Sequence, residues 1–141
     1  MSQHASIIPG FRYKDAPAAI DFLCRAFGFE RHAVYADDKD PSIIHHAQLT
    51  LGGGMIMLGT ARKDPPGDTF PWLTPAELGG VTCCVYVVVT DADAHCAQAR
   101  AEGADIVSEP HDNEGYPGRG YGARDPEGNY WSFGTYDPWV V

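Results

Sequence analysis

Residues 51–60 read LGGGMIMLGT and residues 126–135 read PEGNYWSFGT, so a glycine turn, an apolar stretch and a closing Gly-Thr occur twice. Earlier in each half, residues 27–28 (FG) are matched in the same way by residues 102–103 (EG). A chain built twice from one unit tends to fold as two similar halves. The space between such halves is a natural place for a ligand, so the repeat bears on function as well as on fold.

The composition is that of a water-soluble globular domain. The 141 residues are 44% hydrophobic and 21% charged, and this length suffices for one domain with a sizeable core. No apolar run approaches the roughly 20 residues that span a bilayer. The first residues also lack the basic start and apolar stretch of a signal peptide. We therefore expect a cytoplasmic protein.

The charge balance argues against nucleic-acid and membrane partners. The formal net charge is −9, and the ten Lys and Arg residues are scattered along the chain. Binding to a nucleic acid needs a clustered basic surface that displaces counterions from phosphates, and an anionic membrane surface makes a similar demand. We therefore expect neither partner.

The first half, about residues 5–60, is predicted to fold as a βαβββ module. Asp15 can cap a helix whose first turn contains Pro17, and Gly28 suits the left-handed position after its end. The apolar residues of this helix recur at helical spacing and form one stripe. The stripe consists of Ile20, Leu23, Cys24 and Phe27, and the expected strands are 6–13, 29–35, 43–51 and 54–60.

Residues 61–80 are rich in proline and glycine, which predicts a linker with one short turn at residues 75–78. Phe70 and Trp72 lie in this linker. Exposed aromatic side chains are usually avoided, so these two residues either pin the linker to the body of the protein or belong to a lid over a pocket.

The second half, about residues 81–136, repeats the order of the first. Asp91 or Asp93 can cap its helix, and Gly103 follows the helix end near Ala101. The sequence thus predicts an α+β fold in which two βαβββ modules form a curled mixed sheet around a cleft. The expected strands are 81–89, one that starts at Ile106-Val107, and a hairpin of 119–124 and 129–135 around the turn sequence 125–129.

The four cysteines are predicted to be reduced and buried. Cys83 and Cys84 are adjacent within an apolar run, and the chain contains no C-x-x-C pair. A disulfide or a zinc site is the alternative, and the spacing does not favour it.

The sequence resembles the vicinal oxygen chelate superfamily, the group of glyoxalases, bleomycin-resistance proteins and extradiol dioxygenases. The most specific match is the pattern Asp-Pro-x-Gly-x-x-Trp-Ser at residues 125–132. The resemblance covers roughly residues 5–136 and is nearest to small bacterial PhnB-like and glyoxalase-like proteins. It implies paired modules around a cleft, and a homodimer in which the second chain often completes that cleft.

In the metal-dependent members of this superfamily, His, Glu or Gln side chains hold a divalent ion in the cleft. The resemblance places the four ligand positions at Ile8, Gln48, Cys84 and Ser132. Ile8 cannot coordinate an ion, Ser132 is a poor ligand, and a Cys84 thiolate does not suit an oxygen-rich octahedral site. A stable site normally needs three or four protein donors. We therefore predict neither a metal site nor a cofactor.

His46 is the other candidate of note. It shares strand parity with Gln48, so both side chains should point to one face, while Ala47 and Leu49 take the apolar face. A divalent-metal site on His46, Gln48 and Cys84 is one possibility. Otherwise His46 is a hydrogen-bonding or titrating group on a polar cleft wall, and it is the obvious candidate for a catalytic base.

Parity also assigns the second half. Tyr86 and Tyr130 are placed on the cleft with Cys84 and Ser132, while Trp131 and Phe133, with Val81, Cys83 and Val85, are placed in the core. Residues 111–121 are expected to form a flexible loop from which Tyr116, Arg119 and Tyr121 contact a ligand, unless Arg119 pairs with Asp125 or Glu114. The predicted ligand-binding residues are His46, Gln48, Cys84, Tyr86, Arg119, Tyr121, Tyr130 and Ser132.

This mixed polar and apolar cleft suits a flat or aromatic organic molecule. The predicted function is that of a glyoxalase/bleomycin-resistance-like protein that binds a small organic molecule without the usual ion. The alternative is a metal-dependent or His46-based lyase, isomerase or dioxygenase of the same superfamily. Because no Glu stands at a ligand-equivalent position, classical glyoxalase I activity is not expected.

Overall fold

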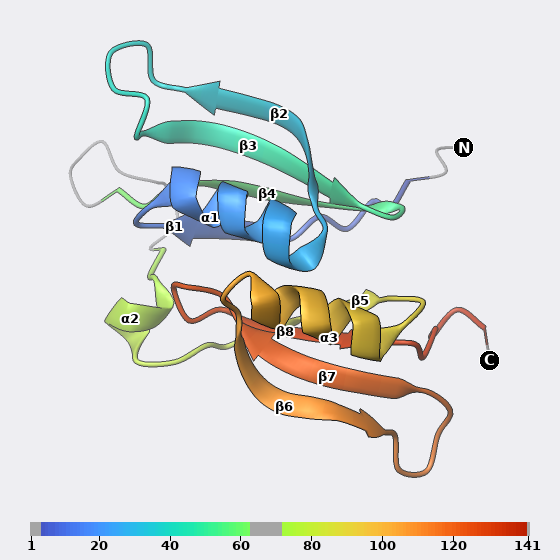
Figure 1. The fold of residues 1–141 in the computed structure, drawn as a ribbon. Coiled ribbons are helices and arrows are strands. Elements are labelled where there is room, and N and C mark those ends of the chain that lie inside the picture. The colour runs from blue at the N-terminus through green and yellow to red at the C-terminus, as the bar shows by residue number, and fades with distance from the viewer. Residues whose placement is uncertain (1–3, 63–71, 141) are drawn as a thin grey trace.

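Two four-stranded mixed sheets make up the protein, one from each half of the chain (Figure 1). The structure, a computed structural model, describes residues 4–62 and 72–140. The first sheet has the order β1-β4-β3-β2 and the second the order β5-β8-β7-β6. In both, the first strand of the half pairs in parallel and the others pair antiparallel. The strands are β1 (Gly10–Tyr13), β2 (Glu30–Ala36), β3 (Ile44–Leu51), β4 (Gly54–Thr60), β5 (Val85–Val88), β6 (Asp105–Asp112), β7 (Arg119–Arg124) and β8 (Tyr130–Gly134).

The identical strand orders confirm the predicted α+β fold of two βαβββ modules. The helices begin and end where the sequence indicates. The Asp15 carboxylate accepts the Ala18 N–H at the start of α1 (Ala16–Phe22), and a π-helical turn, η1 (Leu23–Phe27), leads to Gly28 at φ 90°. Only a glycine takes that left-handed conformation without strain. In the same way the Asp91 carboxylate accepts the Ala94 N–H at the start of α3 (Ala92–Ala101).

The two modules share one hydrophobic core. In Figure 1, α1 and α3 lie next to one another in the middle of the molecule, and α3 contacts η1. The ring of Phe27 lies 5.5 Å from that of Trp131 and 4.7 Å from that of Phe133. Trp131 and Phe133 are fully buried, as the strand parity predicts. Among the described residues, no helix is both long and apolar enough to cross a membrane.

The Asp-Pro-x-Gly motif lies at the boundary between the modules and contacts both of them. Asp125 is 4% exposed, and its carboxylate accepts hydrogen bonds from the Tyr13 hydroxyl at 2.7 Å and from Trp131 Nε1 at 3.1 Å. The same carboxylate accepts the N–H groups of Glu127 and Asn129 within the turn. Burial, followed by the nearby Asp125 charge, raises the pKa of Tyr13 above its ordinary value. This motif therefore joins the two halves.

Three predicted elements differ from the structure. The first strand starts at Gly10 rather than at residue 6, and β5 spans Val85–Val88 rather than 81–89. The ladder between β5 and β8 begins at Val85 and Trp131, next to the start of β8 at Tyr130, so residues 81–84 lie outside it. The loop expected over residues 111–121 is shorter and spans residues 113–118, because β6 extends to Asp112 and β7 starts at Arg119.

The linker prediction is partly visible. A short helix, α2 (Pro75–Leu78), occupies the expected turn, and Thr74 and Glu77 cap it reciprocally. The guanidinium of Arg12 lies 4.7 Å from the centre of the Trp72 ring, which agrees with a role for Trp72 in pinning the linker. Phe70 lies outside the described residues.

Candidate functional site

The open face of the second sheet, opposite α3, carries a pocket of about 140 Å³. The strand register sets its floor. Ser108, Gly122, Ser132 and Tyr86 lie in one row across the sheet, and His111, Gly120, Gly134 and Val88 lie in the next. We call this site the second-sheet pocket. Its lining consists of Tyr86, Ser108, His111, Asn113, Tyr116, Gly120, Tyr121, Gly122, Tyr130, Ser132, Phe133, Gly134 and Tyr136.

Glycine at three floor positions leaves room that two tyrosine rings enter. A methyl group on Gly122 would overlap the hydroxyl end of Tyr130, and one on Gly134 would lie 2.6 Å from the Tyr86 hydroxyl. The Tyr86 hydroxyl crosses Gly134 and donates to the Tyr136 carbonyl at 2.7 Å. Burial is the main reason why the pKa of Tyr86 is raised. The rings of Tyr130 and Tyr86 thus cover the backbone of Gly122 and Gly134.

The opposite rim is polar and comes from β6 and the turn after it. His111 Nδ1 lies 2.8 Å from the Glu109 carbonyl oxygen and 3.5 Å from Ser108 Oγ. The Asn113 side-chain amide donates to the Pro117 carbonyl at 3.0 Å. Side chains from this rim can orient a ligand whose flat part rests on the tyrosine rings.

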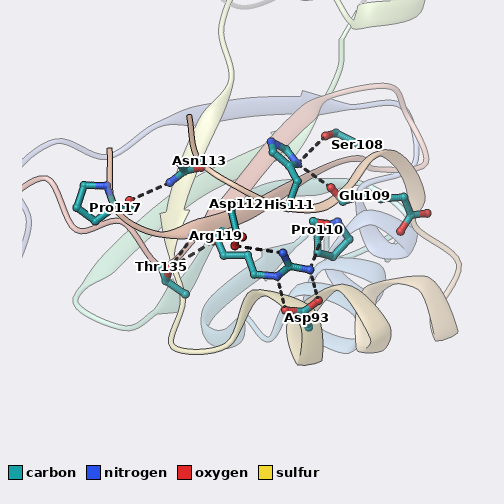
Figure 2. A network of polar contacts seen from close by, with 10 residues as sticks. All are labelled: Asp93, Ser108, Glu109, Pro110, His111, Asp112, Asn113, Pro117, Arg119 and Thr135. Carbon is teal, nitrogen blue, oxygen red and sulfur yellow. Dashed lines mark hydrogen bonds and ion pairs between the residues drawn. The ribbon is translucent and has the colours of Figure 1, made fainter. Parts of the chain in front are cut away.

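Arg119 does not line the second-sheet pocket, and it does not pair with Asp125 or Glu114, the alternatives that the sequence left open. Figure 2 shows it directed at Asp93 of α3, to which its Nε and Nη2 donate at 2.7 Å and 3.0 Å. It also donates to Asp112 and to the Pro110 carbonyl, each at 3.3 Å. These ion pairs raise the pKa of Arg119 and lower that of Asp93. The Asp125 carboxylate instead binds Tyr13 and Trp131. Arg119 links β6 and β7 to α3.

Tyr121 borders the second-sheet pocket but is buried, at 2% exposed. Its hydroxyl is 2.6 Å from His95 Nδ1, and His95 Nε2 is 2.8 Å from the Phe27 carbonyl of the first module. A carbonyl only accepts, so Nε2 carries the hydrogen and Nδ1 accepts from Tyr121. Desolvation lowers the pKa of His95 and raises that of Tyr121. The Tyr121 side chain therefore belongs to the module boundary.

The predicted site residues of the first module lie together on their own sheet. His46 and Gln48 are half-buried on one face, with His46 Nε2 3.2 Å from Gln48 Oε1, while Ala47 and Leu49 are buried on the other. The His46 ring also stacks on Tyr35. None of these residues lines the second-sheet pocket. Its lining therefore unites Tyr86, Tyr121, Tyr130 and Ser132 of the predicted set, without His46, Gln48, Cys84 or Arg119.

The cysteine prediction holds for only part of the set. Cys96 is buried, with its pKa raised by desolvation, and Cys24 is half-buried, whereas Cys83 and Cys84 are exposed. Both exposed thiols, with Val81, precede β5, so Cys83 and Val81 lie outside the core in which the predicted longer strand would place them. All four cysteines are free thiols.

The family's metal does not fit the residues at its four positions. Ile8 offers only an alkyl group, Cys84 lies outside β5, and Gln48 and Ser132 stand on different sheets. Within residues 4–62 and 72–140, no group of three or more His, Cys, Asp or Glu side chains could hold an ion. These four positions therefore offer fewer than the three or four donors that a stable site normally needs.

A second cavity, of about 290 Å³, lies beside α2. Its polar lining is already engaged, because Arg12 stacks on Trp72 while Thr74 and Glu77 cap the helix. We therefore place the candidate site in the second-sheet pocket. The sequence interpretation missed Ser108, Asn113 and Tyr136 as lining residues of this pocket. The alternation Gly120-Tyr121-Gly122 was an available signal, because it puts a glycine on the pocket face at every second residue.

Residues 4–133 match the model of the Glyoxalase/Bleomycin resistance protein/Dioxygenase superfamily. The chain belongs to this superfamily. It is 33% identical over 131 residues to the uncharacterized protein Mb0911c of Mycobacterium bovis, covering 92% of this chain and 82% of that one. The uncharacterized protein MT0910 of Mycobacterium tuberculosis has the same identity, over 92% of this chain and 73% of its own.

Solved structures of superfamily members show the same fold. TioX from Micromonospora sp. ML1 matches with a TM-score of 0.72 and 33% identity, over 94% of this chain and 98% of TioX. The fosfomycin resistance protein FosX from Mesorhizobium loti matches with a TM-score of 0.64 and 16% identity, over 98% and 96% of the two chains. The similarity to FosX shows the fold alone.

Proposed function

We propose that this superfamily member binds a small planar organic molecule in the second-sheet pocket, and that it does so without a divalent metal. The observation that carries the proposal is the floor of Gly120, Gly122 and Gly134, over which the rings of Tyr86 and Tyr130 lie. The glycines let these rings lie close to the sheet, and a flat molecule can stack on such rings. We also propose that the protein falls within the PhnB-like and glyoxalase-like subgroup.

The size of the pocket limits the part of the ligand that enters it. An apolar cavity of about 150 Å³ takes up a benzene ring, and the second-sheet pocket measures about 140 Å³. The pocket is therefore about the size of one aromatic ring, and the rest of a larger molecule extends towards solvent. The nearby hydroxyl groups of Ser108 and Ser132 supply the polar contacts that orient such a ring.

The donor chemistry supports metal independence. A divalent ion would need three or four donors, and Gln48 is the single family position that retains an ordinary oxygen ligand. A base-catalysed reaction on His46 has less support, because His46 does not line the second-sheet pocket. Binding is thus the function that the described side chains support best.

The test combines ligand screening with a variant in which a larger side chain fills the second-sheet pocket. Purified protein is screened by ligand-observed NMR against one-ring and two-ring planar aromatic compounds, and Ser132→Phe is compared with Thr50→Phe. Ser132 lies in the floor of the second-sheet pocket, whereas Thr50 is half-buried on the first sheet. Binding that Ser132→Phe abolishes and Thr50→Phe retains supports the proposal.

Two results would overturn it. The first is the absence of binding across the panel, or binding that Thr50→Phe removes instead of Ser132→Phe. The second concerns the metal: elemental analysis is expected to find no stoichiometric divalent ion, and chelator treatment is expected to leave the affinity unchanged. An ion present at one per chain and needed for binding would contradict metal independence.

A further inference from the structure

A β-bulge interrupts β6 beside the second-sheet pocket. The register with β7 shifts between Ser108 and His111, so Glu109 and Pro110 are left out of the ladder. Pro110 has no N–H to donate, which suits a bulge. Bulges re-aim nearby side chains and are over-represented next to functional sites. Here the side chain that follows the bulge is His111, which faces Gly120 across the strand pair.

The bulge fixes the tautomer of His111. Its Nδ1 lies 2.8 Å from the Glu109 carbonyl oxygen, and because a carbonyl only accepts, Nδ1 must carry the hydrogen. In the neutral ring the lone pair is then on Nε2, at the ring edge away from Glu109. Nε2 makes no hydrogen bond with any residue in the described ranges, and His111 lines the second-sheet pocket.

Two arginines hold the bulge against α3 (Figure 2 shows one of them). Arg119 donates to the Pro110 carbonyl while it grips Asp93 in the first turn of α3. Arg100, in the last turn of the same helix, pairs with the Glu109 carboxylate at 2.6 Å. Exposed ion pairs contribute little stability individually. Their effect here is geometric, because they fix the Glu109 carbonyl towards which His111 donates.

We propose that His111 is a hydrogen-bond acceptor that selects the ligand of the second-sheet pocket. The ligand class is then an aromatic ring that carries a hydroxyl or a ring N–H group, which donates to Nε2 of His111. Arg119 acts as a positioning residue for this acceptor and does not itself touch the ligand. The inference rests on the proposed function, since it concerns the same pocket.

The tautomer is measured first, without any ligand. Long-range ¹H–¹⁵N NMR of the imidazole groups, at a pH where His111 is neutral, is expected to show the hydrogen on Nδ1. In Arg119→Gln the two tautomers of His111 should become mixed, whereas Arg124→Gln, which removes an exposed ion pair with Asp105 on the same sheet, should change nothing. A wild-type His111 with its hydrogen on Nε2 would overturn the inference, as would an unaltered tautomer in Arg119→Gln.

Selectivity is measured next with a matched pair of probes, 2-naphthol and 2-methoxynaphthalene. One hydrogen bond changes affinity by about 3- to 10-fold, so the wild-type Kd should be lower by that factor for 2-naphthol. His111→Phe should still bind both compounds but with equal affinity. His32→Phe, at an exposed position on β2, is the control and should keep the preference.

The outcomes separate the two proposals. Equal affinities in the wild-type protein, or a preference that survives in His111→Phe, would overturn the role of His111 and leave the binding function standing. Failure of the wild-type protein to bind either naphthalene, after the panel has also failed, would overturn both.

Discussion

Replacement of Asp125 by Ala should destabilise the whole protein, although the motif that contains it is the most recognisable part of the sequence. The carboxylate accepts hydrogen bonds from the Tyr13 hydroxyl, Trp131 Nε1, the Asn129 side-chain amide and the N–H groups of Glu127 and Asn129. Tyr13 and Trp131 are both fully buried. In Asp125→Ala both buried side-chain donors lose this acceptor.

The magnitude follows from those two donors. A buried donor left without a partner costs about 1–3 kcal/mol, so the free energy of unfolding should fall by about 2–6 kcal/mol in Asp125→Ala. For a domain of this size each kcal/mol lowers Tm by about 3–5 °C, which predicts a shift of about 6–30 °C. Tyr13→Phe removes one donor together with its need for a partner, so its effect should be clearly smaller.

The assay is urea denaturation followed by the fluorescence of the buried Trp131, with thermal unfolding as a second measurement. Asp105→Ala serves as the control, because Asp105 is exposed and pairs with Arg124 at a distance of 3.5 Å. Its urea midpoint should stay close to that of the wild-type protein. If Asp125→Ala unfolds at the same midpoint as Asp105→Ala, the assignment of Asp125 as the link between the modules is refuted.

Three further predictions concern other parts of the molecule. Cys83 and Cys84 should react with a thiol reagent in the native protein, while Cys24 and Cys96 should react only on unfolding; four equally fast thiols would contradict the burial pattern. Burial lowers the pKa of His95, so stability should fall as the pH drops below about 6.5, where the unfolded chain binds the proton first. In His95→Gln the free energy of unfolding, measured by urea titration at several pH values, should depend less on pH. If its pH dependence is unchanged, a group other than His95 is responsible. We also propose a homodimer in solution that involves the exposed Trp139, which is 93% exposed; light scattering should show a dimer that Trp139→Ser weakens, and a wild-type monomer would count against it.

The fold was predictable because each local signal agrees with the overall arrangement. Asp15 and Asp91 cap the helices, Gly28 and Gly103 end them, and the apolar face of β3 follows from simple alternation. Strand lengths were less predictable, since a strand ends where the neighbouring strand that it pairs with ends, and the sequence does not show that pairing. Residues 81–84 have the composition of a strand, yet they lie outside the ladder between β5 and β8.

The candidate site was predictable only in part. Parity correctly separates Trp131 and Phe133 from Tyr130 and Ser132. The partners of Arg119 depend on the helix α3, which is distant in sequence, and the sequence alone cannot show that Asp93 and Asp112 converge on it. The bulge at Glu109 and Pro110 is equally hidden, because it arises from the pairing with β7.

The bond between Tyr13 and Asp125 joins residues 112 positions apart, and this separation has a consequence for synthesis of the chain. Domains generally fold from the N-terminal end as they leave the ribosome. Here Phe27 and Tyr13 find their aromatic and carboxylate partners only when β8 and the turn before it have been made. The N-terminal module therefore emerges with part of its core uncovered, and the last strands of the chain complete both modules at once.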